Sequence, residues 1–127
     1  MIEALFNQPG YVATKKMMDA TVLRQEAIAS NIANIETPNY KRMDVAPSFA
    51  QELRTALSSK DAQKISSVTP AITEDSSSVS PNRDGNTVQL ETEMMNLSQN
   101  TLAHALETQL VSGSLLKLRL AITGRSS

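Results

Sequence analysis

The sequence contains no cysteine and no tryptophan, and its 127 residues include only two phenylalanines, two tyrosines and one histidine. Without cysteine, the chain can form neither disulfides nor thiolate zinc sites, and it has no cysteine nucleophile. The apolar material is mainly alanine, leucine, isoleucine, valine and methionine. Because such side chains suit narrow helix seams better than a thick globular core, the composition favours an extended helical protein.

Clusters of one charge sign are also missing, because 12 basic and 13 acidic residues are scattered along the chain and leave a net charge of −1. A general polyanion binder shows a basic patch, so we expect no nucleic-acid partner. No stretch approaches the length of a membrane span, and the start, MIEALFNQPGY, lacks the basic residues and apolar run of a cleavable signal peptide. We therefore expect neither a membrane span nor Sec-type processing.

Groups that could carry catalysis or bind a metal are sparse. His104 and Glu107 could form half of a metal site on one helical face, but a zinc site needs three or four ligands. His104 also has no identifiable nucleophile beside it, so a small hydrolase is disfavoured. We expect no enzyme activity, no cofactor and no metal, and we interpret His104 as a residue of a helix seam.

A long helix is predicted near the start of the chain, from about residue 8 to residue 35. Asn7 can cap it, and Pro9 suits the first turn because its missing amide would be unpaired there anyway. Apolar residues recur along it in steps of three and four, with additional isoleucines widening the stripe, which indicates a face that packs against other helices. The packing residues are Met18, Val22, Ile28, Ile32 and Ile35.

A second long helix, from residue 87 to residue 123, has the strongest periodic signal. Asn86 can cap its start, Gln89 stands in a capping-box position, and Gly124 can end it. Helices of roughly 40 and 55 Å need partners along their length. The second helix carries positions spaced alternately by four and three residues, which is a coiled-coil period. They are Leu90, Met94, Leu97, Thr101, His104, Thr108, Val111, Leu115, Leu118 and Ile122.

The segment between these helices has little pattern. Residues 66–82 contain six serines and two prolines without a periodic apolar face, which predicts a flexible or irregular linker. Before it, Phe49, Leu53 and Leu57 predict a short helix. We therefore expect an all-α fold in which the two long terminal helices pair in an antiparallel, coiled-coil-like manner. The expected parts are an N-terminal helix with its turn, a short helix with a flexible middle, and a C-terminal helix, at residues 1–43, 44–83 and 84–127.

A sharp turn is encoded directly after the first helix. The Thr-Pro pair at 37–38 pushes the chain towards extended geometry, and Asn39 tolerates the left-handed conformation at the third position of a type II turn. We expect Tyr40 to fold back and pack its ring, while Lys41 and Arg42 stay hydrated.

The sequence SNIANIETPNYKR around this turn resembles the signature of bacterial flagellar basal-body rod proteins. Asn39 departs from the glycine that is usual in this family, a change that the turn geometry permits. The matching residues are Ser30, Asn31, Ile32, Ala33, Asn34, Thr37, Pro38, Tyr40 and Lys41.

A second stretch, beginning at DGNTVQLETEMM, resembles the D-G-N-x-V-x-L/M-x-x-E-M ending found in the proximal-rod branch of the same family. His104 and Ala105 stand where relatives often have an aromatic residue near a basic one. Together the two motifs and their helices cover about two thirds of the chain. The residues that match the second motif are Asp84, Gly85, Asn86, Val88, Leu90, Glu93 and Met94.

The resemblance implies a structural role in motility, in which terminal helices pack with those of neighbouring subunits in a self-assembled tube. It implies contacts with copies of the same chain and with other rod, rod-adaptor and membrane-ring proteins. It also implies a location in the periplasmic rod of the basal body, reached unfolded through the flagellar type III export apparatus without a cleavable signal. The alternatives are another rod subunit, or a soluble helical adaptor or export chaperone that folds stably alone.

The sequence FAQEL is similar to the pattern that the export gate recognises in early flagellar substrates. Phe49 and Leu53 lie one helical turn apart, so one pocket could take both side chains. Short matches of this kind also arise by chance, and the same pair can serve local packing. Both interpretations stay open at this point.

Polar residues interrupt the predicted seams. Polar groups inside an apolar seam weaken association but select one register, so they can fix the alignment of subunits if they lie at helix contacts. The alternative is that they face solvent or a lumen. The residues concerned are Gln25, Thr101, His104 and Thr108.

Overall fold

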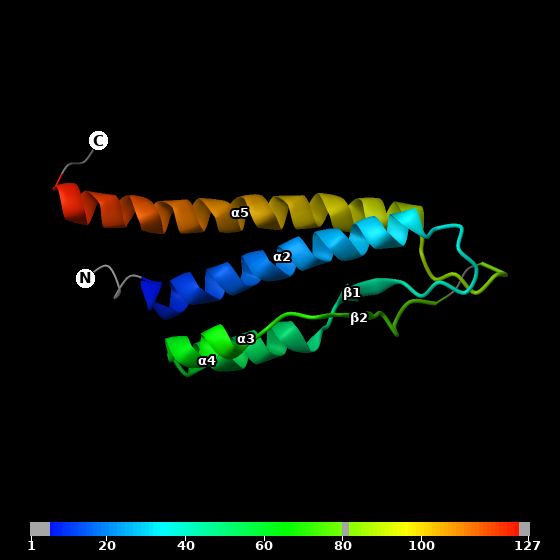
Figure 1. Cartoon of the computed structure of the whole chain (residues 1–127), viewed down its shortest axis with the longest axis horizontal. Helices are drawn as coiled ribbons and strands as arrows, with labels where there is room; N and C mark the ends of the chain where they lie inside the picture. The colour runs from blue at the N-terminus through cyan, green and yellow to red at the C-terminus, as the bar shows by residue number, and fades with distance from the viewer. Residues whose placement is uncertain (1–5, 80–81, 125–127) are drawn as a thin grey trace.

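The two long helices lie side by side and run antiparallel, as predicted (Figure 1). The computed structural model describes residues 6–79 and 82–124. Helix α2 (Pro9–Ala33) has proline at its start, and helix α5 (Leu90–Thr123) follows a cap at Gln89. The predicted start of α5 is therefore three residues early. Its end is confirmed, because Gly124 adopts a left-handed φ of 63° and donates its amide to the Leu120 carbonyl.

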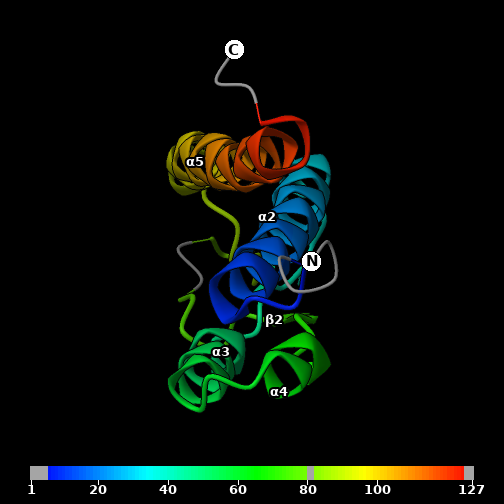
Figure 2. The same ribbon diagram turned by 90° about the vertical axis from the view of Figure 1, so that its left-hand side faces the viewer.

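A third layer lies on the other side of α2 from α5 (Figures 1 and 2). It contains the short helices α3 (Ser48–Ser58) and α4 (Ala62–Ser67) and two strands, β1 (Met43–Val45) and β2 (Ile72–Glu74). The strands pair antiparallel, with Val45 opposite Ile72. The all-α prediction is corrected by this small sheet.

Strand β2 also corrects the prediction of a flexible or irregular linker for part of residues 66–82. Three residues are too few to show an alternating pattern in the sequence, and the pairing depends on a partner strand far along the chain. Backbone bonds extend the pairing beyond both strand ends, from Ala46 to the Ala71 carbonyl and from Asp75 to the Arg42 carbonyl, each at 2.8 Å.

The apolar core lies between α2 and this third layer. The predicted short helix is confirmed as α3, and Phe49 and Leu53 are both buried, whereas Leu57 is 42% exposed. The large buried apolar residues of this core all come from residues 45–68, between the two long helices. The core residues are Ala13, Ala20, Val45, Phe49, Leu53, Ala56, Ile65 and Val68, with Val12 and Leu23 packed against them.

The residues that α5 buries in its seam with α2 are polar. The buried residues of α5 are Glu93, Asn100 and Glu107, and they face α2 at intervals of seven residues. The apolar positions predicted for a coiled-coil seam lie on the neighbouring flank of α5, so coiled-coil packing stays a prediction. Of those positions, Leu90, Met94, Leu115 and Ile122 are exposed, and Leu97, Val111 and Leu118 are half-buried.

Two further features of the described ranges concern function. No helix in residues 6–79 and 82–124 is both long and apolar enough to cross a lipid bilayer. The same ranges contain no group of three or more histidine and acidic side chains placed to hold a metal ion. Strand β1 spans the boundary predicted between residues 43 and 44, and the division of the chain into three parts stays a prediction.

Candidate assembly site

The turn after α2 has the predicted backbone. The helix ends at Ala33, and the amides of Thr37 and Tyr40 bond to the carbonyls of Asn34 and Thr37, at 3.0 and 3.3 Å. Asn39 has a φ of 60°, which confirms the left-handed conformation expected there. The chain thus reverses direction within a few residues of the helix end.

Asn31, in the last turns of α2, connects this turn to two other elements. Its side chain is fully buried, and its oxygen accepts bonds from the Met43 amide at 2.9 Å and the Tyr40 hydroxyl at 3.2 Å. Its nitrogen donates to the Met43 carbonyl at 2.8 Å and to Glu93 of α5 at 3.2 Å. Tyr40 folds back onto α2, where its hydroxyl also lies 3.1 Å from Ser30 Oγ. These four bonds use the full capacity of the Asn31 amide.

The second motif holds the turn of the first one in place. Asn86 is fully buried, and its side-chain nitrogen lies 2.8 to 3.1 Å from the backbone oxygens of Asn34, Ile35 and Thr37. Its side-chain oxygen accepts the Val88 amide at 2.8 Å. The prediction that Asn86 caps the second helix is wrong, because the helix begins at Leu90 after Gln89 and the Asn86 oxygen bonds to Val88 before it.

The backbone of the second motif adds to this clamp. The Asn39 amide donates to the Asp84 carbonyl at 2.8 Å, and the Lys41 ammonium donates to the Gly85 carbonyl at 2.8 Å. Gly85 has a φ of +80°, and a Cβ placed there would lie 2.6 Å from Asn39 Oδ1. The left-handed backbone conformation favours glycine at this position, and a Cβ there would also displace the end of the Asn39 side chain.

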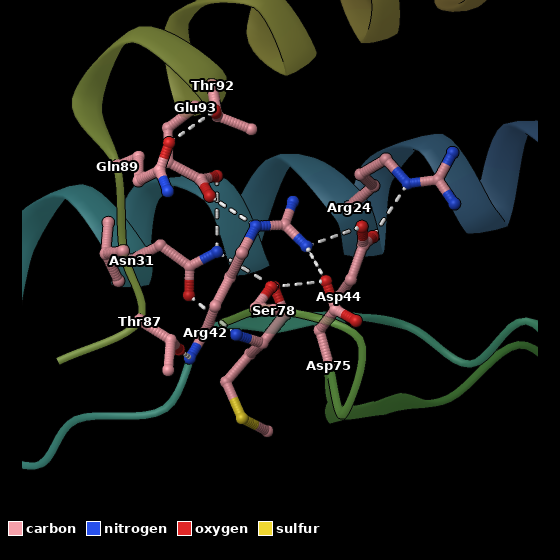
Figure 3. Close-up of polar contacts among 12 residues, drawn as sticks. Arg24, Asn31, Arg42, Asp44, Asp75, Ser78, Thr87, Gln89, Thr92 and Glu93 are labelled. Atoms are coloured by element: carbon pink, nitrogen blue, oxygen red, sulfur yellow. Dashed lines mark hydrogen bonds and ion pairs between the residues drawn. The ribbon is translucent and has the colours of Figure 1, made fainter. Parts of the chain in front are cut away.

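Arg42 forms the centre of an ion-pair network between three segments (Figure 3). Its guanidinium donates to Glu93 of α5, to Asp44 of β1 at 3.1 Å and to Asp75 after β2 at 2.8 Å. Arg24 of α2 bonds to Asp44 from the other side at 2.9 Å. The Arg42 side chain is only 7% exposed, so the prediction that it stays hydrated is wrong. Three carboxylates from separate parts of the sequence accept hydrogen bonds from the guanidinium in place of water.

The electrostatics keep this network charged. Burial opposes the charge of Arg42, but its bonds to Glu93 and Asp44 outweigh that effect and raise the pKa of the guanidinium above its usual value. Hydrogen bonds from Ser77, together with Ser78 and Arg42, lower the pKa of Asp75 to about 2. A buried pair of this kind is costly to break, because one partner alone would leave an uncompensated charge.

A second polar group lies further along the seam between α2 and α5. Thr21 Oγ1 lies 3.0 Å from Glu107 and 3.2 Å from His104 Nδ1. Asn100 donates to the Thr21 carbonyl at 2.9 Å and to Gln25 at 3.3 Å. Burial raises the pKa of Glu107 above its usual value. We call these residues the polar layer.

The structure brings together only part of the predicted polar set. Gln25 and His104 belong to the polar layer, whereas Thr101 and Thr108 bond to carbonyls of their own helix at 2.8 Å and are exposed. Whether any of them sets the alignment of subunits stays a prediction.

The predicted packing residues occupy different environments. Ile28 is 1% exposed and thus already buried within the chain, while Val22 is 49% exposed. Met18, Ile32 and Ile35 are half-buried. The proposed export residues Phe49 and Leu53 belong to the apolar core. The folded chain therefore leaves part of α2 and most of the predicted stripe of α5 available to other molecules.

Sequence reasoning missed the residues that connect the layers. It interpreted Glu93 as a motif match and as an acidic residue at the positive end of a helix, and it assigned no role to Asp44, Asp75 or Asn100. One signal was present, because Glu93, Asn100 and Glu107 are separated by seven residues and must share a helix face. No comparable signal marks Asp44 or Asp75, whose role depends on the pairing of two short strands.

Comparison with known proteins gives consistent matches. The family model described as "Flagella basal body rod protein" matches residues 18–41, which include the first motif. The flagellar basal body rod protein FlgB of Borrelia hermsii is 34% identical, over 75% of this chain and 82% of its own length. FlgB of Cereibacter sphaeroides ATCC 17029 is 34% identical, over 80% and 84% respectively. FlgB of Escherichia coli K12 is 30% identical, over 72% and 77%.

Proposed function

Because the chain belongs to the FlgB family of flagellar basal body rod proteins, it is a structural subunit of the proximal rod, and we propose that α5 and α2 build the contacts between subunits. The observation that carries this proposal is the uncovered apolar surface of α5. All three residues that α5 buries are polar, whereas most of its large apolar side chains are exposed. A helix with this distribution needs further partners to cover it.

The uncovered side chains form two stripes on α5. One is the flank that the coiled-coil period predicts, with Leu90, Met94, Leu115 and Ile122 between 43% and 63% exposed. The other is turned away from the buried residues, because Met95 and Leu102 fall about half a turn from Glu93 and Asn100, and Leu106 falls about 100° from Glu107. It contains Met95, Leu102 and Leu106, which are 55% to 63% exposed. Two stripes on separate faces provide for two different neighbouring helices.

The junction of the two motifs has a different role in this proposal. Asn31, Arg42, Asn86 and Glu93 are buried within one chain, so they are not available to a neighbour. Their bonds fix the start of α5 against the end of α2. A fixed angle between the helices presents both stripes in one orientation, which a shaft that transmits torque through interdigitated helices requires.

The same surface argues against a self-contained helical adaptor or export chaperone. Such a protein would bury its leucines when folded alone, whereas α5 keeps Leu102 and Leu110 more than 60% exposed. We further propose that the partners are copies of the same chain and other rod, rod-adaptor and membrane-ring proteins.

Export and location complete the proposal. The subunit would reach the periplasmic rod unfolded, through the flagellar type III apparatus. Phe49 and Leu53 are each 7% exposed in the folded chain, so the export gate could bind them only before folding. The same two side chains would then serve recognition in the unfolded chain and packing in the folded one.

Complementation of a deletion strain tests the role of α5. Leu102→Gln with Leu106→Gln should remove motility and reduce the number of complete basal bodies seen by electron microscopy, because the outward stripe loses its apolar contacts. Both side chains are more than half exposed, so the purified variant should keep the circular dichroism of the parent chain. Leu57→Gln, at an exposed site on α3, is the matched control and should swim normally. A motile double variant with normal basal bodies would exclude the outward stripe as an assembly surface.

A further inference from the structure

The contacts that hold α5 against α2 end well before α5 does. The last residue that α5 buries is Glu107, which accepts a hydrogen bond from Thr21 at 3.0 Å, and none of the described residues after it, 108–124, is buried. The two helices cross at an angle and separate towards the end of α5 (Figures 1 and 2). The last part of α5 is therefore not fixed in the way that its first part is.

The sequence is weak for a helix just beyond this point. Residues 112–114 read Ser-Gly-Ser within α5. Glycine is the poorest helix former after proline, and serine competes for backbone hydrogen bonds, so this triplet makes the helix easier to bend. Ser114 Oγ donates to the Leu110 carbonyl at 3.1 Å, a bond of the kind that bends helices. Sharp bends in long helices are found at such glycine and serine pairs.

Nothing in the described part of the chain requires glycine at position 113. Its backbone is helical, and a Cβ placed there would meet no other part of the chain within 4 Å. Gly85 differs, because its backbone is left-handed and a Cβ there would approach Asn39. Gly113 serves neither a turn nor a close contact, so its physical effect is to make the backbone of α5 easier to distort.

Beyond the triplet, α5 continues as a short apolar and basic segment, residues 115–123, which we call the arm. Leu116 and Ile122 of the arm are 50% and 63% exposed, and its two charged residues are both basic. We propose that residues 112–114 are a hinge that lets the arm change direction relative to residues 90–107. The use of this motion rests on the proposed function, because an arm that turns can meet neighbouring subunits that the fixed part of α5 does not reach.

Distances between spin labels test the hinge, and the absence of natural cysteine makes the labelling specific. One label, at Thr55→Cys on α3, gives a fixed reference because α3 is packed into the apolar core. The second label is at Ala121→Cys on the arm or, as the matched control, at Gln109→Cys before the triplet. All three residues are exposed, so the changes should not disturb the fold. Pulsed EPR of the purified chain measures both distance distributions.

We expect the broader distribution for the arm. Ala121 lies about 12 Å beyond Gly113 along the helix, so a bend of about 20° displaces it by about 4 Å, which should broaden the distribution by a similar amount. Gly113→Ala should narrow this distribution and leave that of the Gln109 pair unchanged. Equal widths for the two pairs in the parent chain, or no effect of Gly113→Ala, would overturn the proposal.

Unravelling of the last turns of α5 would also broaden the distribution, so a second measurement separates it from a hinge. A hinge moves an intact helix, and the carbon chemical shifts of residues 115–120 in the parent chain should therefore be helical. Random-coil shifts there would overturn the proposal.

These measurements use the purified chain and do not depend on assembly, so the role of the hinge in assembly has its own test. In the deletion strain, Gly113→Ala should reduce swimming, whereas Gly10→Ala, at another glycine with open space around it, should swim normally. If Gly113→Ala swims normally although its distances have narrowed, the motion of the arm has no role in assembly. If the parent chain is absent from basal bodies, the proposed function itself fails.

Discussion

The two sides of helix α2 are built from opposite kinds of contact. On one side, Ala13 and Ala20 pack against Phe49, Leu53 and the other apolar residues of the third layer. On the other side, Thr21 and Asn31 make hydrogen bonds to α5. Burial of apolar groups gives most of the stability of a small fold, whereas hydrogen bonds contribute less but specify geometry. The comparison indicates that the third layer stabilises the subunit and that the polar seam sets the position of α5.

This difference explains how one subunit can be both folded and ready to assemble. The apolar side of α2 is covered by the chain itself, while α5 is held by a few directional contacts and leaves its apolar stripes free. If the seam were apolar as well, several registers of α5 would have similar energies. The polar contacts therefore stabilise the pair of helices less than apolar contacts would, but they define the orientation of α5 relative to α2.

The largest expected effect is on the apolar side. Phe49→Ala should lower the free energy of unfolding by about 3–5 kcal/mol, because it leaves a cavity among the core side chains. Urea denaturation followed by circular dichroism measures the change. Leu57→Ala, at an exposed site on the same helix, should change it by no more than about 0.5 kcal/mol. Equal effects would mean that the third layer does not stabilise the subunit.

The next effect is on the polar side. Arg42→Met should destabilise the chain by about 3 kcal/mol in the same measurement, because Glu93 is then buried without its cation. Adding Glu93→Met removes that buried charge but also the Glu93 acceptor of the buried Asn31 amide, so it should recover only part of the lost stability. If the double variant were as unstable as the single one, the ion-pair network would contribute to the free energy of unfolding as well as to the position of α5.

A smaller effect is expected where the motifs meet. Gly85→Ala should cost about 1–2 kcal/mol, because its backbone is left-handed and the new Cβ would meet Asn39. Gly113→Ala is the control, in a helical site with open space around it, and should raise the helical content and stability of the isolated chain by about 0.5–1 kcal/mol. If Gly85→Ala left the free energy of unfolding unchanged, the junction of the two motifs would not depend on glycine at this position.

The smallest expected effect is a pH dependence from Asp75. Its pKa is lowered to about 2 in the folded chain from an ordinary value of 3.8, so its contribution is present above about pH 4 and is lost as the pH falls towards 2. The stability difference between the parent chain and Asp75→Asn should therefore shrink across that window. Since Asp75 is partly exposed, we expect about 1 kcal/mol at neutral pH.

Ser77→Ala provides the matched variant, because Ser77 is the main cause of the lowered pKa of Asp75. It should move the pH window towards the ordinary value of a carboxyl. A constant difference between the parent chain and Asp75→Asn from pH 2 to pH 6 would contradict the assignment.

Sequence reasoning succeeded where the cause is local. The left-handed Asn39 and the helix end at Gly124 follow from the conformational preferences of single residues. The two long helices follow from periodicity. It failed for Arg42 and Asn86, because their partners in other segments lie 33 to 52 residues away in the chain. Only the meeting of separate segments shows that these polar side chains are buried.

The sequence by itself determined the long helices, the turn between them and the family, because propensity, spacing and motif are properties of neighbouring residues. The tertiary structure decided which face of α5 meets α2. Two faces of α5 share almost the same helical period, so the apolar pattern could not distinguish them. The choice depends on polar groups of α2 and on Arg42, which bond mainly to the face of Glu93, Asn100 and Glu107.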